Sequence, residues 1–188
     1  MKFTKTPLEG VWIVEPKRFG DARGYFMETF KASAFEEATG LRPDFVQDNE
    51  SMSTRGVLRG LHFQKGEFSQ AKLVRVSRGR VLDVAVDIRH GSPTFGQYVA
   101  VELSDENLRQ LYIPRHFAHG FLVLSDVAQF QYKVDNIYCP QSEVTLRFDD
   151  LAVGIDWPIA KEEMLLSAKD LVGMSLDDVK AHPEFSAD

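Results

Sequence analysis

Residues 72–134 decide the fold and read "KLVRVSRGRVLDVAVDIRHGSPTFGQYVAVELSDENLRQLYIPRHFAHGFLVLSDVAQFQYKV". The stretch consists of about six short runs with alternating apolar and polar residues, separated by turn-forming residues. Strands this short and this closely spaced predict an antiparallel sandwich or barrel, because parallel βαβ units need a helix between successive strands. The turns are expected near Gly79, Gly91–Pro93, Ser104–Asn107, Pro114–Gly120 and Ser125–Asp126.

Alternation within the strands predicts which side chains face the interior. In "AQFQYKV", Phe130 and Tyr132 share the apolar face, so Tyr132 is expected to point inward. In "RVLDVAVDI", the apolar face runs from Leu82 to Ile88 and Asp83 lies on the other face. If both faces are covered, Asp83 lies inside the barrel and needs a polar partner.

Helices are expected only at the periphery of this β-rich domain. Ser33–Thr39 is predicted to be a short helix, with a capping box between Ser33 and Glu36 and a stop at Gly40. A second short helix is predicted to begin at Ser175. The whole chain, residues 1–188, is expected to form a single domain, with a short C-terminal helical segment from about residue 160 packed on the barrel.

Composition narrows the class of protein. The 188 residues are 44% apolar and carry a formal net charge of −6, which argues against a nucleic-acid binder, since that function needs clustered cations. The single cysteine, Cys139, is interpreted as a partly buried loop thiol and fits a reducing compartment. The first residues lack an apolar signal-peptide core, and no apolar run is long enough to span a bilayer. We therefore expect a cytoplasmic protein that binds neither nucleic acid nor membrane.

A histidine and several cations are concentrated in "RGVLRGLHFQKGEFSQAK", residues 55–72. Strict alternation would place Arg59 and His62 on opposite faces of a strand. Gly60 between them is a site where a β-bulge could turn both side chains to the same face. Lys72 begins the next strand, and by itself it is interpreted as a solvated lysine.

Residue types alone leave three interpretations of His62 open. It is a structural histidine, a metal ligand, or a general base. The metal interpretation is weakened because His116 and His119 are dispersed and have no obvious carboxylate partner. A general base needs a carboxylate to orient its ring. The carboxylates available for that role are Asp83, Asp87 and Asp170.

Other candidates are ambiguous when taken singly. Arg23 in "FGDARGYF" fits a surface turn as well as an aromatic clamp with a cation near a phosphate. The segment Gln47–Asn49 fits a loop better than a base-reading site, and Glu143 and Lys169 are ordinary surface types. The sequence has no Walker loop and no dinucleotide-binding glycine pattern, so a phosphate would be held by side chains.

Long motifs carry a family resemblance. The segments "FVQDNESMSTRGVLRGLHFQ", "KLVRVSRGRVLDVAVDIRHGSPTFGQYVAVELS" and "YIPRHFAHGFLVLSD", followed by "DWP" and "LSAKDL", resemble the dTDP-4-dehydrorhamnose 3,5-epimerases over nearly the whole chain. The resemblance implies an all-β, antiparallel, cupin-like jelly-roll barrel. It implies an isomerase that inverts C3 and C5 of dTDP-4-dehydro-6-deoxy-D-glucose to give dTDP-4-dehydro-L-rhamnose for dTDP-L-rhamnose biosynthesis and cell-surface polysaccharide. It also implies a homodimer that uses no metal and no organic cofactor.

The resemblance assigns roles to individual residues. It implies that His62 is the base, that Asp170 is its partner, that Tyr132 is the proton donor, and that Lys72 stabilises charge on the C4 oxygen. The implied contacts with the substrate diphosphate, sugar and nucleoside are Arg23, Arg59, His119, Glu28, Gln47, Asn49, Phe19, Phe26, Tyr138, Glu143 and Lys169.

Three other functions compete with this one. The nearest is a 3- or 3,5-epimerase that acts on a related dTDP-4-keto sugar in another deoxysugar pathway. A jelly roll that binds a sugar nucleotide without catalysis would lack His62 or Tyr132, and both are present. A metal-dependent cupin oxygenase or isomerase predicts a transition metal in the purified protein.

Overall fold

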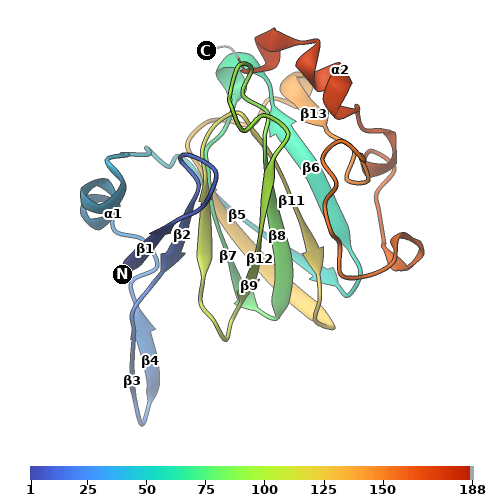
Figure 1. The fold of residues 1–188 in the computed structure, drawn as a ribbon. Coiled ribbons are helices and arrows are strands. Elements are labelled where there is room, and N and C mark those ends of the chain that lie inside the picture. The colour runs from blue at the N-terminus through green and yellow to red at the C-terminus, as the bar shows by residue number, and fades with distance from the viewer. Residues whose placement is uncertain (187–188) are drawn as a thin grey trace.

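Two antiparallel sheets face each other in the structure, a computed structural model that describes residues 1–186 (Figure 1). The six-stranded sheet has the order β1-β2-β10-β7-β12-β5, and the five-stranded sheet has the order β13-β6-β11-β8-β9. The predicted antiparallel jelly-roll barrel is therefore confirmed. The strands are β1 (Lys2–Lys5), β2 (Trp12–Glu15), β3 (Arg18–Asp21), β4 (Gly24–Met27), β5 (Gln47–Thr54), β6 (Leu58–Gln64), β7 (Lys72–Arg78), β8 (Arg80–Asp87), β9 (Tyr98–Ser104), β10 (Gln110–Ile113), β11 (Phe117–Val123), β12 (Val127–Val134) and β13 (Glu143–Thr145).

The space between the sheets is filled by one apolar cluster, and strand alternation correctly predicts that Phe130 and Tyr132 face it. Phe130 of β12 is 1% exposed and stacks on Phe121 of β11 with ring centroids 4.0 Å apart. Tyr132 packs against the same cluster, which confirms its inward orientation. Asp83 is fully buried among these residues and bonds to His119, so its predicted need for a partner is met.

Short helices cover the outer faces of both sheets (Figure 1). Phe35 of α1 (Ala32–Thr39) packs edge-on against Tyr112 of the six-stranded sheet, with ring centroids 4.9 Å apart. On the other side, residues of α2 (Leu176–Lys180) and Phe185 join the cluster on the outer face of the five-stranded sheet. The 3-10 helices are η1 (Gly66–Phe68), η2 (Pro140–Ser142), η3 (Lys161–Glu163), η4 (Asp170–Val172) and η5 (Pro183–Ser186).

The helix ends follow the predicted chemistry in part. Gly40 ends α1 in the left-handed conformation (φ 74°) and Ser175 caps α2 in a capping box, as expected. The prediction of a capping box at Ser33 is wrong. The helix begins at Ala32, one residue earlier than predicted, and its N-cap Lys31 makes no side-chain capping bond. Apolar packing of Phe35 therefore sets the start of α1, rather than a hydroxyl cap.

The predicted turn at Pro114–Gly120 is too long, because β11 already begins at Phe117. Gly120 lies within this strand for a packing reason and not for a turn. A Cβ on Gly120 would lie 2.6 Å from the carbonyl oxygen of Arg59, and one on Gly60 would lie 2.6 Å from the Cα of Gly120. The two glycines let β6 and β11 approach closely.

A β-bulge at this contact turns two candidate side chains to the same side. His119 pairs with His62, and Phe121 pairs with Arg59, so β6 advances three residues where β11 advances two. Arg59 and His62 both line the same cavity as a result. The bulge expected at Gly60 is thus confirmed.

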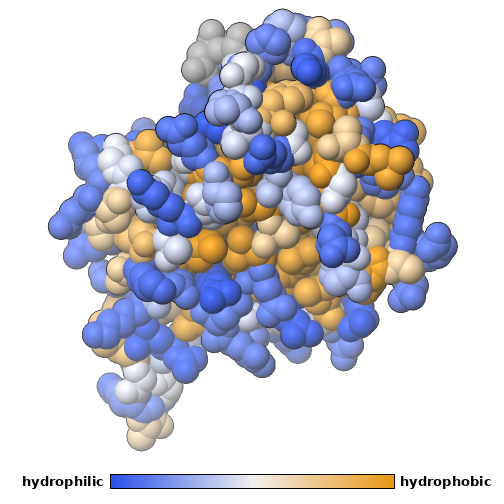
Figure 2. All heavy atoms as spheres, viewed as in Figure 1, coloured by the Kyte–Doolittle hydropathy of each residue, from blue (hydrophilic) through white to orange (hydrophobic). Residues whose placement is uncertain are grey.

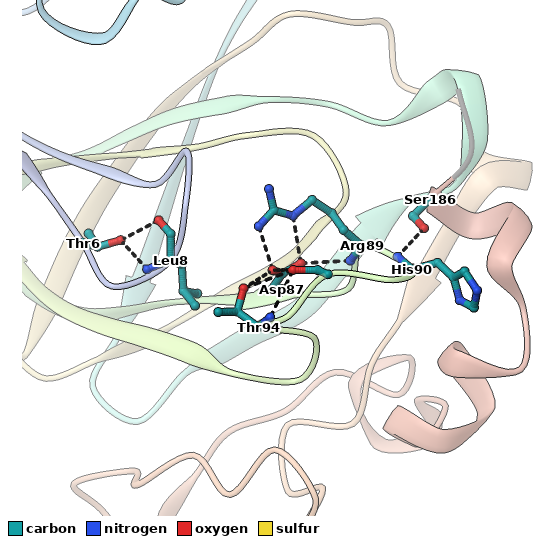
Figure 3. A network of polar contacts seen from close by, with 8 residues as sticks. Thr6, Leu8, Asp87, Arg89, His90, Thr94 and Ser186 are labelled. Carbon is teal, nitrogen blue, oxygen red and sulfur yellow. Dashed lines mark hydrogen bonds and ion pairs between the residues drawn. The ribbon is translucent and has the colours of Figure 1, made fainter.

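Asp87 fastens the loop between β8 and β9 (Figure 3). Its buried carboxylate accepts hydrogen bonds from Arg89 Nη2 at 2.7 Å, Thr94 Oγ1 at 2.6 Å and Ser92 Oγ at 2.7 Å. Burial would raise the pKa of Asp87, but these donors outweigh burial and lower the pKa. Since its partners are all in the loop, Asp87 has a structural role and is not the partner of His62.

A hairpin of β3 and β4 projects away from the two sheets (Figure 1). Phe19, Tyr25 and Phe26 on it are 52%, 61% and 66% exposed. In Figure 2 the projection carries hydrophobic as well as hydrophilic residues. A two-stranded hairpin is marginally stable by itself in water, and the three exposed rings give this one an apolar surface.

Candidate functional site

A cavity of about 680 Å³ is lined by His62 and Tyr132. His62 belongs to β6 of the five-stranded sheet and Tyr132 to β12 of the six-stranded sheet. A small ring bound between the sheets would therefore meet the imidazole and the phenol from different sides. Other predicted residues that line this cavity are Gln47, Asn49, Arg59, Tyr138, Glu143, Lys169 and Asp170.

The partner of His62 is Asp170, which resolves the choice among three carboxylates. His62 Nε2 lies 2.5 Å from Asp170 Oδ1, and Ser167 Oγ donates to Asp170 Oδ2 at 2.5 Å. Burial would raise the pKa of Asp170, but the hydrogen bonds from His62 and Ser167 outweigh burial and lower the pKa. An ionised carboxylate here holds a proton on Nε2 of His62 and leaves the lone pair of Nδ1 for a reacting proton.

Tyr132 keeps its proton. Burial raises the pKa of its phenol above the usual range, although the charge of Arg59 opposes this. Arg59 itself is held by a bond from its Nε to Ser53 Oγ at 3.0 Å. A protonated phenol at this position can act as an acid.

Lys72 and His119 line a smaller chamber of about 140 Å³ that shares Arg59 and Tyr132 with the main cavity. Burial lowers the pKa of Lys72 to about 8, although the negative charges of Asp83 and Glu143 oppose this. The ammonium form of Lys72 at neutral pH can stabilise a negative oxygen. The smaller chamber therefore combines a cation, Lys72, with an acid, Tyr132.

The rim of the cavity is a polar network. Tyr138 Oη donates to Glu143 Oε2 at 3.0 Å, and Lys169 Nζ donates to Glu143 Oε1 at 2.8 Å. Gln47 Nε2 donates to Asn49 Oδ1 at 2.7 Å. Burial would raise the pKa of Glu143, but the hydrogen bonds from Lys169 and Tyr138 outweigh burial and lower the pKa. The rim thus offers amides, charges and an exposed ring to a ligand.

Four predicted contacts lie away from this cavity within the same chain. Phe19, Arg23 and Phe26 line a separate hollow of about 350 Å³ on the hairpin, where Arg23 pairs with Asp21 at 2.5 Å. Glu28 follows directly after β4 and is exposed. A single chain does not bring these side chains to His62.

Sequence reasoning missed Ser167, which holds Asp170 in place. The available signal was a serine three residues before an acidic residue, the spacing of a capping box. Within residues 1–186, no group of three or more His, Cys, Asp or Glu side chains is placed to hold a metal ion. In the same range, no helix has the length and apolar character needed to cross a membrane.

Comparison with known proteins settles the family. A family model described as dTDP-4-dehydrorhamnose 3,5-epimerase matches residues 5–178. The chain belongs to this epimerase family. The dTDP-4-dehydrorhamnose 3,5-epimerase of Salmonella typhimurium (strain LT2) is 55% identical over 173 residues, which cover 92% of this chain and 94% of that protein.

Solved structures in the epimerase family share the fold. A dTDP-6-deoxy-D-glucose-3,5-epimerase from Legionella pneumophila in complex with dTDP-4-keto-L-rhamnose is 49% identical with a TM-score of 0.92, covering 97% of this chain and 96% of that one. A 3'-monoepimerase from Streptomyces bikiniensis in complex with dTDP-quinovose is 34% identical with a TM-score of 0.89, covering 96% and 90%.

Proposed function

We propose that this protein inverts C3 and C5 of dTDP-4-dehydro-6-deoxy-D-glucose to give dTDP-4-dehydro-L-rhamnose in dTDP-L-rhamnose biosynthesis. One observation carries the proposal. The His62–Asp170 pair and the protonated Tyr132 line one cavity from opposite sheets. We place the reaction in the cytoplasm, because a single cysteine suits a reducing compartment.

The chemistry follows from the C4 ketone. C3 and C5 both flank this carbonyl, which acidifies their protons. His62 removes the proton. The C–H electron pair forms a double bond to C4, and the π pair of the carbonyl moves onto the C4 oxygen to give an enolate beside the ammonium of Lys72. Tyr132 then returns a proton to the carbon from the other side, and the carbonyl reforms. The step inverts one carbon without oxidation or reduction.

The rim binds the nucleotide in this proposal. Arg59 is the cation within the cavity that is suited to the diphosphate, since a guanidinium matches phosphate oxygens in two hydrogen bonds. Tyr138 offers an exposed ring for stacking on the base. The remaining rim residues assigned to substrate contacts are Gln47, Asn49, Glu143 and Lys169.

A homodimer would complete the site. The hairpin carries Arg23 and two exposed phenylalanines that contact nothing in the cavity of their own chain. We assign the hairpin of one copy to the cavity of the other, where Arg23 adds a second cation for the diphosphate and Phe19, Phe26 and Glu28 add contacts to the ligand. This arrangement buries the exposed rings that a lone hairpin leaves in water.

Mixing two inactive variants tests the dimer. His62→Ala removes the base and Arg23→Ala removes the hairpin cation, so each homodimer has two defective sites. A heterodimer has one site with both an intact cavity and an intact hairpin. After the subunits are exchanged, turnover is expected to recover to about a quarter of the wild-type value. Recovery of no activity, with mixed dimers shown by mass spectrometry, would contradict hairpin exchange.

The pH dependence of turnover tests Lys72. Its pKa is lowered to about 8 by burial, so its ammonium is present below that pH and is lost as pH rises through it. We expect kcat to decline above about pH 8. Lys72→Met should reduce kcat by about 10²–10³-fold and remove this decline. The measurement is kcat from about pH 7 to 9.5. If kcat of Lys72→Met still declines at high pH, the decline is caused by a group other than Lys72.

Deuterium incorporation tests the activity itself. The protein is incubated with the dTDP-4-keto sugar in deuterated water, and the product is analysed by NMR. Label at both C3 and C5 supports the 3,5-epimerase. No label at either carbon would refute it and leave a binding protein without catalysis. If chelation of metals abolishes labelling, the metal-dependent alternative applies instead.

The second candidate is a 3-epimerase acting on a related dTDP-4-keto sugar. Its support is the 3'-monoepimerase among the structural neighbours, although the identity of 34% is lower than the 49% to the 3,5-epimerase. Label at C3 alone, with C5 unlabelled, selects this candidate.

A further inference from the structure

Gln64, the last residue of β6, is a buried amide that has no part in the chemistry proposed above. The residue is 5% exposed and does not line the cavity, although it lies two positions after His62 on the same strand. Burying an amide costs free energy unless its polar atoms are hydrogen-bonded. The hydrogen-bond partners of Gln64 therefore indicate what the side chain does.

The partners of Gln64 lie on both sides of Tyr138. Its Oε1 accepts a hydrogen bond from the main-chain nitrogen of Cys139 at 2.6 Å, and its Nε2 donates to the carbonyl oxygen of Ile137 at 3.1 Å. Nε2 also donates to the carbonyl oxygen of Phe68 at 3.0 Å, so both amide protons are used. A single side chain thus fixes the main chain immediately before and immediately after Tyr138.

Tyr138 has little main-chain support of its own. It lies between the end of β12 at Val134 and η2, and within residues 1–186 its main chain makes no hydrogen bond. Its hydroxyl bonds to Glu143, but that bond restrains the side chain and not the main chain. Tyr138 is 52% exposed and lines the cavity. A loop residue that becomes ordered only when a ligand binds lowers the affinity for that ligand, so a ring held in place beforehand binds more tightly.

Other bonds fasten the ends of this loop. Asn136 Nδ2 donates to the carbonyl oxygen of Glu67 at 2.8 Å, and the main-chain nitrogen of Lys65 donates to the carbonyl oxygen of Ser142 at 3.0 Å. These contacts lie two residues before Tyr138 and four residues after it. Loss of the Gln64 amide should therefore loosen residues 137–139 without detaching the whole loop.

We propose that Gln64 is a positioning residue for nucleotide recognition, whose amide holds the ring of Tyr138 ready to stack on the base of a bound pyrimidine nucleoside diphosphate. This inference rests on the proposed function, which assigns Tyr138 to the base. Gln64 itself touches neither the ligand nor the reacting carbons. It acts through the two main-chain groups that flank Tyr138.

The binding test compares dTDP with 2-deoxyribose 5-diphosphate, which has the same sugar and diphosphate but no base. Calorimetry gives the Kd of each ligand for the wild type and for Gln64→Met, which keeps the length of the side chain and removes all three bonds. Gln64→Met is expected to bind dTDP about tenfold more weakly than the wild type, and the base-free ligand equally well. An equal loss for both ligands, or an unchanged Kd of dTDP, overturns the inference.

Combining Gln64→Met with Tyr138→Ala shows whether Gln64 acts through the ring. Tyr138→Ala alone should weaken dTDP binding about tenfold or more, because it removes the stacking surface. The double variant should then bind dTDP no more weakly than Tyr138→Ala does. Losses that multiply in the double variant overturn the inference, because they show that the two side chains contribute independently.

Asn107→Leu is the matched control for a general loss of stability. Asn107 is also an amide with three main-chain bonds, to Ser104, Arg109 and Glu102, but it does not line the cavity. Asn107→Leu is expected to leave the Kd of both ligands unchanged. If it weakens dTDP binding as much as Gln64→Met does, general loosening explains the effect and the inference is overturned.

Hydrogen exchange in the wild type makes the test independent of whether Gln64→Met folds. The amide proton of Cys139 bonds to Gln64 Oε1, so it is expected to exchange slowly in the free protein and to gain little protection when dTDP binds. Rapid exchange in the free protein, followed by strong protection with dTDP, would show that the ligand and not Gln64 orders the loop.

Turnover separates the loop from the catalytic base. In Gln64→Met, KM should rise about tenfold and kcat should stay within about twofold, because His62 keeps its bond to Asp170. A fall in kcat with an unchanged KM would place the effect of Gln64 on His62 and overturn the inference. Failure of the proposed function is distinguishable, because the wild type would then incorporate no deuterium into the keto sugar. Deuterium incorporation together with a Kd of dTDP that does not depend on Gln64 refutes only the role of Gln64.

Discussion

Replacing His62 by alanine is expected to reduce kcat by about 10²–10⁴-fold, the usual contribution of a general base. The imidazole is bonded to the buried Asp170 at 2.5 Å and borders the same cavity as Tyr132. Without the imidazole of His62, the His62–Asp170 pair has no base that can remove the proton next to the ketone. The measurement is the initial rate of epimerisation at saturating substrate, together with deuterium uptake into recovered substrate. Both rates should fall together, because abstraction precedes every later step.

Substitutions around the base separate its chemistry from its orientation. Asp170→Asn keeps the shape of the side chain but can donate a hydrogen bond from its amide to Nε2 of His62. This favours the tautomer with the proton on Nδ1, which cannot accept the reacting proton. The value of kcat should therefore fall, while the Kd of dTDP stays near the wild-type value. Ser167→Ala removes one of the bonds to the carboxylate and should cost less, about 3–10-fold. Wild-type turnover by His62→Ala would contradict the assignment, because it would show that a group other than His62 is the base.

Replacing Tyr132 by phenylalanine is expected to separate proton removal from inversion. The base still forms the enolate, but the phenol that returns a proton from the opposite sheet is gone. The enolate is then reprotonated from the side of His62, which exchanges the proton without inverting the carbon. Product formation should fall by about 10²–10⁴-fold, whereas deuterium uptake into recovered substrate persists. NMR of the recovered sugar measures both quantities in one experiment.

Tyr138→Phe is the matched control, since it removes a phenol from the rim of the same cavity. Its hydroxyl donates to Glu143 at 3.0 Å, and Tyr138 does not line the smaller chamber that contains Lys72. Its loss should therefore change kcat/KM by about 3–10-fold and leave inversion coupled to exchange. If Tyr132→Phe also inverts both carbons at the wild-type rate, another group must be the acid.

Local patterns predict much of the barrel. The alternation of side chains places Phe130 and Tyr132 inside and puts Asp83 in the interior, because successive residues of a strand point to opposite faces. Gly40 and Ser175 end and begin helices as expected, since both act through bonds within a few residues. The same rules fail at Ser33 and at Gly120. Near Ser33 the packing of Phe35 accompanies the start of the helix, and at Gly120 the close approach of β6 and β11 requires a glycine within a strand. Both depend on contacts with residues distant in the sequence.

The sequence by itself determined the strand pattern, the family resemblance and the types of side chain available for chemistry. Only the tertiary structure decided which carboxylate serves His62, since Asp170 lies 108 residues away along the chain. It also decided that the residues of the hairpin lie apart from the cavity of their own chain. The physical reason is that hydrogen-bond partners across a barrel are chosen by the arrangement of whole sheets and segments. The spacing of residues along the chain therefore does not predict which of them form such bonds.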